Sequence, residues 1–355
     1  MALARDGRTL VAVYGRNHGG IGPYLKVSND GGLSWDEERQ VLRFNDDNNY
    51  SPVHETRNHS ILTFDLPHGC QRHIVFGVGV GDQDEQRKLH QWVSEGGNMT
   101  WVHSLVNGIA RCEYAPRSMA QLDDGRHLVL FHTVEGTCNK NGKRRIKSAT
   151  WEATSRDSGI TWETNTKRIL LSDDDGFCEP CLFQSGNIIV ALLRAYNNGH
   201  RSAWIQKTET GWSKPRQLPN SLNGDAHITS FGKEEAKLVV CFRQSRDQAK
   251  QNANDTGGQP HQYFVAWSGA FEDILEGRNG DALAVLVKND GYDPQVCNSG
   301  NSKFQKGDCG YAGLAQLDDG TFVSVVHSTL TDQGDKCPSI YCVRFTLSDI
   351  QASNG

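Results

Sequence analysis

Short apolar runs alternate with polar, glycine-containing turns along the whole chain. One layout, a polar turn with Gly followed by a strand rich in Val, Ile, Leu and Phe, recurs at 4–16, 122–134, 183–196, 231–244 and 317–328, and segment 61–80 has the same character. Runs of this length between Asp-Gly or Ser-Gly turns predict β-strands, and helical periodicity is nearly absent. Only Phe271–Glu276 is expected to form a short helical turn, and the polar stretch 244–262 is expected to be a long mobile loop.

A second motif recurs between these units and marks tight turns. Ser28–Trp35 reads S-x-D-G-G-x-S-W and Ser155–Trp162 reads S-x-D-x-G-x-T-W, with a degenerate copy at Ser94–Trp101 and a shorter one at Lys207–Trp212. In such a turn Asp and Ser or Thr bond the backbone, Gly takes positive φ, and Trp packs the turn onto its sheet. The motif resembles the Asp-box, or BNR repeat, of sialidases (neuraminidases). We therefore predict one all-β domain over residues 1–355, a six-bladed β-propeller of the sialidase type with four-stranded antiparallel blades and Asp-boxes on its outer rim.

The net charge and the number of cysteines indicate which binding partners and which cellular compartment to expect. The net charge of −5 is small and mixed, and no stretch approaches 18 apolar residues, so we expect neither a nucleic-acid partner nor a membrane span. Ten cysteines, an even number, favour disulfides in an oxidising compartment, with Cys112–Cys138, Cys297–Cys309 and Cys337–Cys342 close enough in sequence to pair. A secreted or extracellular monomer is expected, although the first residues show no signal peptide. A cytosolic protein with reduced thiols is the alternative.

The first candidate for chemistry is the pair Glu179 and Arg194. Glu179 precedes an apolar run, and Arg194 follows fifteen positions later, which places the two on adjacent antiparallel strands. The motif E-P-x-x-x-x-x-G-x-x-x-x-x-x-x-R resembles that of the sialidase superfamily. The resemblance implies that Glu179 polarises a nucleophilic tyrosine and that Arg194 binds the sugar carboxylate. A buried structural ion pair is the alternative.

The segment Gly310–Leu314 carries the second candidate, Tyr311. It resembles the sialidase segment that holds the nucleophilic tyrosine, and so implies this role for Tyr311. A phenol with a pKa near 10 needs a nearby carboxylate to accept its proton, and it avoids the repulsion that a carboxylate nucleophile would exert on an acidic sugar. The alternative is a core tyrosine whose hydroxyl bonds a backbone carbonyl.

Two further arginines and several histidines complete the candidate set. Arg243 ends a strand of the fifth unit and Arg16 ends one of the first, and the resemblance assigns both to substrate binding. The loop after Arg16 lacks the acidic residue that sialidases use as general acid, so His18 is the candidate substitute. Candidate substrate-binding histidines, chosen because they flank strand ends, are His59 and His227.

These residues support three hypotheses. The first is an exo-acting glycoside hydrolase of the sialidase superfamily on a carboxylate-bearing sugar such as sialic acid, with Tyr311 as nucleophile, Glu179 as its base and His18 as acid. The second is a polysaccharide lyase on uronate-containing glycans, in which arginine neutralises the carboxylate and a histidine with Tyr311 moves the protons. The third is a non-catalytic glycan-binding propeller. No local metal-ligand spacing such as HExxH occurs, so neither a metal nor another cofactor is expected.

Overall fold

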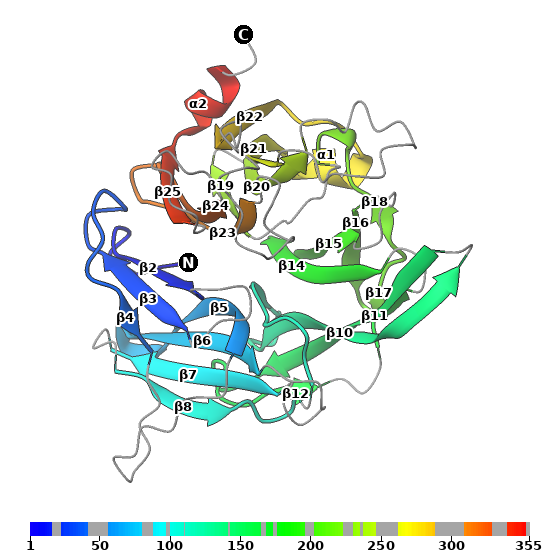
Figure 1. The fold of residues 1–355 in the computed structure, drawn as a ribbon, viewed down its shortest axis with the longest axis horizontal. Coiled ribbons are helices and arrows are strands. Elements are labelled where there is room, and N and C mark those ends of the chain that lie inside the picture. The colour runs from blue at the N-terminus through cyan, green and yellow to red at the C-terminus, as the bar shows by residue number, and fades with distance from the viewer. Residues whose placement is uncertain are drawn as a thin grey trace, which may run out of the picture. The chain divides into compact units, whose positions relative to one another are not determined.

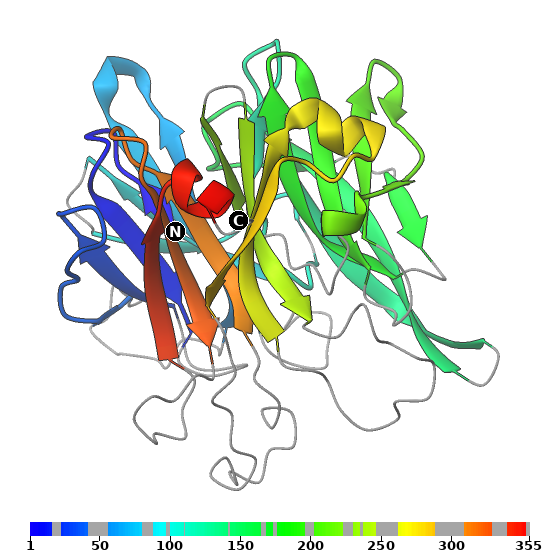
Figure 2. The ribbon, with the colours of Figure 1, turned by 90° about the horizontal axis from the view of Figure 1, so that it is seen from above.

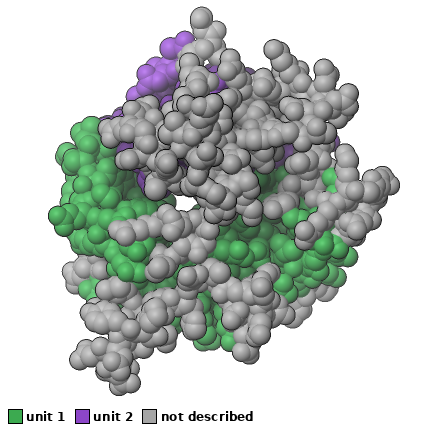
Figure 3. All heavy atoms as spheres, in the orientation of Figure 1, with its two compact units in different colours: residues 1–200, 204–215 green, residues 201–203, 216–355 purple. Residues whose placement is uncertain are grey.

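The computed structural model describes most of the chain in separate stretches. These are 1–15, 23–41, 56–79, 88–96, 100–109, 111–140, 143–164, 168–172, 176–195, 202–222, 230–234, 237–245, 262–287, 309–328 and 339–352. The chain divides into two compact units, of which unit 1 comprises 1–200 and 204–215 and unit 2 comprises 201–203 and 216–355 (Figure 3).

Unit 1 contains four antiparallel sheets that follow one another along the chain (Figure 1). The first has the order β1-β2-β3-β4 and the second β5-β6-β7-β8, while the third contains β9 to β13 and the fourth β14 to β17. The strands are β1 (Ala2–Leu3), β2 (Leu10–Tyr14), β3 (Tyr24–Ser28), β4 (Arg39–Gln40), β5 (Thr56–Asp65), β6 (Gln71–Gly79), β7 (Leu89–Glu95), β8 (Val102–Leu105), β9 (Met119–Gln121), β10 (His127–Lys140), β11 (Lys143–Ser155), β12 (Glu163–Thr164), β13 (Leu170–Ser172), β14 (Phe177–Ser185), β15 (Ile188–Ala195), β16 (Ala203–Thr208) and β17 (Gly211–Trp212), with a 3-10 turn, η1, at Pro67–Gly69.

Unit 2 contains two further antiparallel sheets and two short helices. The sheets have the orders β19-β20-β21-β22 and β23-β24-β25. The elements are β18 (Arg216–Gln217), η3 (Asn220–Leu222), β19 (Ser230–Glu234), β20 (Lys237–Ser245), β21 (Gln262–Ala270), α1 (Phe271–Glu276), β22 (Ala282–Val287), β23 (Cys309–Gln316), β24 (Phe322–Ser328), β25 (Ser339–Phe345) and α2 (Leu347–Ala352). The expected helical turn is confirmed as α1. Of the expected loop 244–262, residues 246–261 lie outside the described part, while its two ends belong to β20 and β21.

The six sheets are the blades of a six-bladed β-propeller, which confirms the predicted fold class. We number the blades 1 to 6 in chain order. Each path of neighbouring strands runs from first to last in chain order or its reverse, so each strand lies beside the one before it in the chain. Figure 2 shows the blades from the side, with the strands of each sheet stacked edge to edge. No helix in the described residues is long and apolar enough to cross a membrane.

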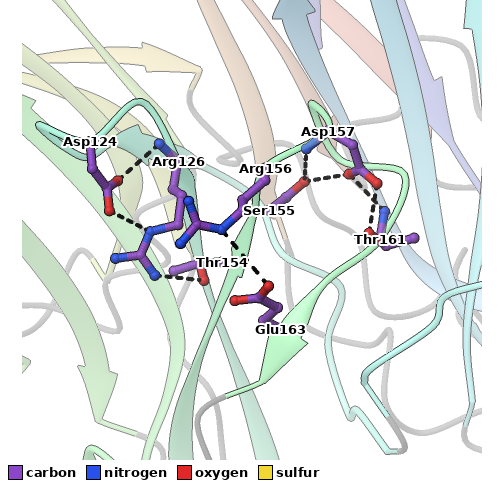
Figure 4. Close-up of polar contacts among 8 residues, drawn as sticks. All are labelled: Asp124, Arg126, Thr154, Ser155, Arg156, Asp157, Thr161 and Glu163. Carbon is purple, nitrogen blue, oxygen red and sulfur yellow. Dashed lines mark hydrogen bonds and ion pairs between the residues drawn. The ribbon is translucent and has the colours of Figure 1, made fainter.

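The two best copies of the turn motif have nearly identical hydrogen bonds. In blade 3, Asp157 accepts the N–H groups of Ile160 and Thr161 at 3.1 and 2.9 Å and the Thr161 hydroxyl at 2.6 Å, while the Ser155 hydroxyl accepts the Gly159 N–H at 2.8 Å (Figure 4). In blade 1, Asp30 and Ser28 make the corresponding bonds to the turn that ends at Trp35. Gly159 has φ +89°, which a side chain rarely tolerates. The predicted turn chemistry is therefore present.

The turn tryptophans pack into the apolar layers between neighbouring blades. Trp162, at the end of the blade 3 turn, is 4% exposed and lies edge-on to Phe76 of blade 2 with ring centroids 6.4 Å apart. Trp101, at the end of the degenerate copy, joins Val11 and Ile61 in the layer that blades 1 and 2 share. Within the part of the chain that the structure describes, the indole nitrogens of Trp101 and Trp162 have no hydrogen-bond partner, so their contribution is apolar packing. Through these tryptophans, the turn motif contributes to the packing of consecutive blades.

Replacing Asp157 with Asn should destabilise the protein by about 1–2 kcal/mol. The substitution removes the charge that accepts four hydrogen bonds of the turn, and a hydrogen bond to a charged group contributes more than a neutral one. Urea unfolding of both proteins measures the difference. Asp124→Asn is the matched control, because Asp124 is exposed and bonds only Arg126 on the same turn among the contacts drawn in Figure 4. An equal loss in both variants would contradict this assignment.

Cysteine side chains in the described residues are mostly buried thiols. Cys112, Cys178, Cys181 and Cys241 are free and buried, and burial raises the pKa of the Cys181 thiol to about 11. Cys112 donates to the Tyr114 carbonyl at 2.6 Å and does not form the suggested bridge to Cys138. The side chains of Cys297, Cys309 and Cys337 lie outside the described residues, so the other two pairings stay predictions.

Candidate functional site

The first strand of three blades contains a β-bulge at the same place. Near the start of β5, β14 and β23 the pairing with the second strand shifts by one residue. The extra residue falls at Asn58-His59 in blade 2, Glu179-Pro180 in blade 4 and Tyr311-Ala312 in blade 6. Asn58 and Glu179 both have positive φ, at 55° and 51°, which is uncommon for residues other than glycine. Bulges of this kind re-aim side chains and are frequent beside active sites.

The bulge of blade 4 directs Glu179 into a buried ion-pair group. The Glu179 side chain is 1% exposed, and both of its carboxylate oxygens accept from Arg194 Nη1, at 3.2 and 3.3 Å. Arg117 approaches the same carboxylate from blade 3, with 3.8 Å between Nη1 and Oε2. The side chains of Arg117 and Arg194 are only 10% and 16% exposed. Low exposure on all sides makes these charges strongly interdependent, since little water screens them.

His132 on β10 holds the backbone of the bulge. The Glu179 N–H donates to His132 Nδ1 at 3.1 Å, and the His132 ring stacks on Tyr114 with centroids 4.9 Å apart. Because Nδ1 accepts this bond, the proton of the neutral ring is on Nε2. The Arg117 guanidinium lies 5.5 Å above the Tyr114 ring. We refer to Glu179, Arg117, Arg194, His132 and Tyr114 together as the Glu179 cluster.

Blade 3 supplies Arg117 and Tyr114 because its first strand is mostly irregular. Tyr114 forms an isolated bridge with His132, and regular pairing resumes only at Met119, opposite Val129. Arg117 lies in the stretch between them, at the place where the other blades have their bulges. The Ser118 hydroxyl accepts the Leu182 N–H of β14 at 2.5 Å, which attaches this stretch to blade 4.

The same stretch also contacts the bulge of blade 2. Arg57 Nη2 and Glu113 Oε1 form an ion pair at 2.7 Å, and Asn58 Nδ2 donates to the Glu113 carbonyl at 2.9 Å. His59 turns into its own blade, where Nε2 lies 2.9 Å from the Thr56 hydroxyl. Its ring also packs so closely over Gly77 that a Cβ there would lie 2.8 Å from it. His59 is therefore beside the Glu179 cluster in the fold but directed away from it.

In unit 2, the candidate Arg243 and the side chain of His327 both lie close to Gly310. His327 Nδ1 lies 2.7 Å from the Gly310 carbonyl and donates to it. Arg243 is 7% exposed, and its Nη1 and Cδ, together with His327 Cε1, would each lie 3.8 Å from a Cβ at Gly310. Gly310 has φ +145° and immediately precedes Tyr311, so Arg243 lies next to the backbone that carries the proposed nucleophile. The Tyr311 side chain itself lies outside the described residues.

The predicted site residues thus fall into three sets. Glu179 and Arg194 are in direct contact, as the strand spacing predicted. Arg243 and Tyr311 belong to unit 2 and Glu179 belongs to unit 1, so the contact of Glu179 with Tyr311 stays a prediction. Arg16, His18 and His227 lie outside the described residues. Within the described residues no group of three or more His, Cys, Asp or Glu side chains is arranged to hold a metal ion.

Sequence analysis missed Arg117, His132 and Tyr114. A signal for His132 existed, because the second strand of several repeat units has a basic residue soon after its apolar run: His132 opposite Tyr114, Arg194 opposite Cys178 and His327 opposite Gly310. Aligning the repeats by these apolar runs identifies His132. Arg117 has no such signal, because the strand in front of it is irregular.

Acid should destabilise the protein through two histidines. Burial lowers the pKa of both His132 and His59 to about 4; at His132 the Glu179 charge opposes this shift, while Arg117 and Arg194 add to it. Between pH 6.5 and 4 the unfolded chain therefore binds more protons, so the free energy of unfolding falls as the pH falls through this window.

Urea unfolding from pH 7 to 4.5 measures this dependence. His132→Asn keeps an acceptor near Nδ1 but cannot titrate, so it should reduce the slope by up to about 1.4 kcal/mol per pH unit. The exposed His68→Asn should keep the wild-type slope. An unchanged slope in His132→Asn would show that the ring is not held neutral by its burial.

Comparison with solved structures identifies the fold. A protein of unknown function from Dyadobacter fermentans superimposes with a TM-score of 0.61 over 96% of both chains, at 12% identity. The Hadza microbial sialidase Hz136 gives a TM-score of 0.58 and 15% identity over 98% of this chain and 65% of its own. The fold is that of a sialidase propeller.

The likeness extends to another glycosidase. The GH93 α-L-arabinofuranosidase of Fusarium graminearum gives a TM-score of 0.52 and 15% identity, over 87% of this chain and 98% of its own. Structures similar to the sialidase-type propeller described here therefore include glycoside hydrolases with different named activities. No model of a known protein family matches the sequence, and no curated protein sequence matches it either.

Proposed function

We propose that the protein is an exo-acting glycoside hydrolase of the sialidase type, which acts on a sugar carrying a carboxylate. One observation carries this proposal: Glu179 is buried in a strained bulge between two arginines, on a fold that known glycosidases share. A carboxylate within reach of a phenol can accept its proton, which is the task that the proposal gives to Glu179.

The proposed reaction assigns one task to each residue. Tyr311 attacks the anomeric carbon while its phenolic proton passes to Glu179, and the glycosidic bond breaks as the leaving oxygen takes a proton from His18. Water then attacks the anomeric carbon and breaks the tyrosyl–sugar bond, with His18 accepting a proton from the water and Glu179 returning its proton to the departing Tyr311 oxygen. Arg194, Arg243 and Arg16 bind the sugar carboxylate, because the planar guanidinium matches its geometry.

A panel of fluorogenic monosaccharide glycosides tests this proposal. The 4-methylumbelliferyl glycosides of sialic acid and glucuronic acid should be cleaved, and those of glucose and galactose should be cleaved far more slowly. Neutral sugars cleaved as fast as acidic ones would contradict the carboxylate assignment. Absence of cleavage across the panel would contradict the hydrolase and leave the glycan-binding propeller as the better account.

A uronate polysaccharide lyase is the second candidate, favoured by the stacked His132–Tyr114 pair beside Arg117. In such an enzyme an arginine neutralises the uronate carboxylate, so that a His or Tyr can remove the neighbouring proton. A lyase creates a carbon–carbon double bond, and its product absorbs in the ultraviolet. Incubation with polygalacturonate, followed by absorbance, separates the two chemistries, since a hydrolase creates no such bond.

A further inference from the structure

The backbone of Glu179 has a conformation that neither its own side chain nor the next residue favours. Its φ of 51° lies in the left-handed region, where a side chain is crowded by the backbone. Pro180 follows directly, and a proline favours extended backbone in the residue before it. Such a conformation persists only where the surrounding structure holds it. The contacts of this bulge therefore govern the direction of the Glu179 carboxylate.

The strand beside the bulge is not what holds the Glu179 N–H. Cys178 pairs with Arg194 and Cys181 pairs with Leu192, so the bulge between them falls outside the ladder of β14 and β15. The Glu179 N–H donates instead to a side chain of blade 3, the Nδ1 atom of His132, at 3.1 Å. Glu179 and His132 are 3% and 1% exposed, so little water is available to replace this bond.

His132 is itself fixed by contacts of its ring and of its backbone. The ring stacks on Tyr114, with 4.9 Å between centroids and 22° between the ring planes. The His132 carbonyl accepts the Glu113 N–H at 3.0 Å, and the residue pairs with Thr150 of β11 in the ladder. Because the ring and the backbone are both held, Nδ1 has a fixed place from which it can hold the neighbouring blade.

A packing role and a proton-transfer role would make different demands on His132. Packing on Tyr114 needs a planar ring but no acceptor, whereas the bond to the Glu179 N–H needs an acceptor at the Nδ1 position. A catalytic base has to reach the proton that it removes. The Nδ1 atom of His132 is engaged by Glu179, and the residue is 1% exposed, so its geometry suits the holding of a backbone better than proton transfer.

We propose that His132 is a positioning residue, whose Nδ1 holds the Glu179 backbone in the bulge and thereby aims the Glu179 carboxylate. The inference rests on the proposed function, because the direction of this carboxylate governs turnover only if Glu179 accepts a proton in the reaction. A reacting group that is misplaced by about 1 Å can cost roughly 100-fold in rate. Loss of the His132 acceptor should therefore be seen in kcat.

Two substitutions separate the acceptor of His132 from its ring. His132→Asn keeps an acceptor near the Nδ1 position and removes the ring, while His132→Phe keeps a ring that can stack on Tyr114 and removes the acceptor. His73 provides the matched controls, His73→Asn and His73→Phe. It is 3% exposed, and its Nδ1 lies 2.9 Å from the Thr63 hydroxyl, at the end of β6 away from the bulge of blade 2.

Steady-state kinetics on the fluorogenic sialoside, well below the melting temperature of every variant, gives the first result. His132→Phe should lower kcat about 100-fold and change KM less than about threefold, because the arginines still bind the sugar carboxylate. His132→Asn and both His73 variants should keep kcat within about threefold of the wild type. Wild-type turnover in His132→Phe would overturn the proposal. Loss of turnover in His132→Asn would also overturn it, because the ring itself would then be the required group.

Two measurements without substrate test the same bond. Protein labelled with nitrogen-15 in glutamate and histidine should show a scalar coupling between the Glu179 amide nitrogen and His132 Nδ1. The Glu179 signal is identified by its absence from Glu179→Gln. In a double-mutant cycle, the losses of melting temperature in His132→Phe and Glu179→Gln should be less than additive, because a relaxed bulge has already weakened the ion pair with Arg194.

These measurements keep the two proposals separate. An absent coupling in the wild type, or strictly additive losses of melting temperature, would overturn the assignment of His132 even if acidic glycosides are cleaved. A coupling and a non-additive cycle in a protein that cleaves no glycoside would contradict the proposed function alone, and would leave His132 as the residue that holds the Glu179 bulge.

Discussion

Replacing Tyr311 with Phe should reduce turnover of an acidic glycoside by about three orders of magnitude or more. The substitution removes only the hydroxyl, so the melting temperature should remain nearly unchanged. Without the hydroxyl no bond to the anomeric carbon can form, and the proton that Glu179 would accept is absent. Steady-state kinetics on the fluorogenic sialoside, with calorimetric melting of both proteins, measures both effects.

Tyr341→Phe is the matched control for this experiment. Tyr341 is on β25, two strands away from β23 in the same blade, so the control removes the same atom from the same sheet. It should keep wild-type turnover. Full activity in Tyr311→Phe would exclude Tyr311 as nucleophile and would favour the lyase or the binding propeller.

Replacing Glu179 with Gln should both abolish turnover and destabilise the protein by about 3 kcal/mol. Two guanidiniums that are 10% and 16% exposed would then face a neutral amide, and removing one partner of a buried ion pair leaves the others without compensation. Urea unfolding gives the stability, and the fluorogenic assay gives the turnover. The two effects have separate causes, so Arg117→Gln introduced into Glu179→Gln should recover part of the stability but none of the activity.

An exposed ion pair provides the control for Glu179. Glu163 lies 3.9 Å from Arg156 on the surface of blade 3, and their side chains are 69% and 64% exposed (Figure 4). Solvent screens such a pair, so Glu163→Gln should change the free energy of unfolding by less than about 0.5 kcal/mol. A loss in Glu179→Gln no larger than this would show that the buried carboxylate is not balancing the two arginines.

The fold could be predicted from the sequence because short strand and turn patterns recur from blade to blade. An apolar run after a glycine turn, such as 317–328, specifies a strand without knowledge of the rest of the chain, and Asp157 with Trp162 specifies a turn in the same way. The short strands β9 and β13 could not be predicted, because their pairing depends on partners far away in the chain. Helix α2 was also missed, since only burial of Leu347 and Ile350 against blades 5 and 6 makes six residues hold a helix.

The site could be predicted only where two residues share one hairpin. Glu179 and Arg194 are separated by a single turn, so strand spacing is enough to bring them together. Arg117 reaches the same carboxylate from another blade, and His132 binds the backbone N–H of Glu179 in a bulge that no residue type predicts. Contacts made by side chains on irregular backbone can therefore be identified only from the structure.

The recurring bulge has a consequence for how such a protein can change its chemistry. Asn58, Glu179 and Tyr311 occupy the same position in three separate sheets, and each sheet has its own ladder and its own apolar faces. A substitution at one bulge alters one reactive group without disturbing the frame that holds the others. A new nucleophile, acid or sugar-binding side chain can therefore be introduced at one of these positions at a time, by evolution or by protein engineering.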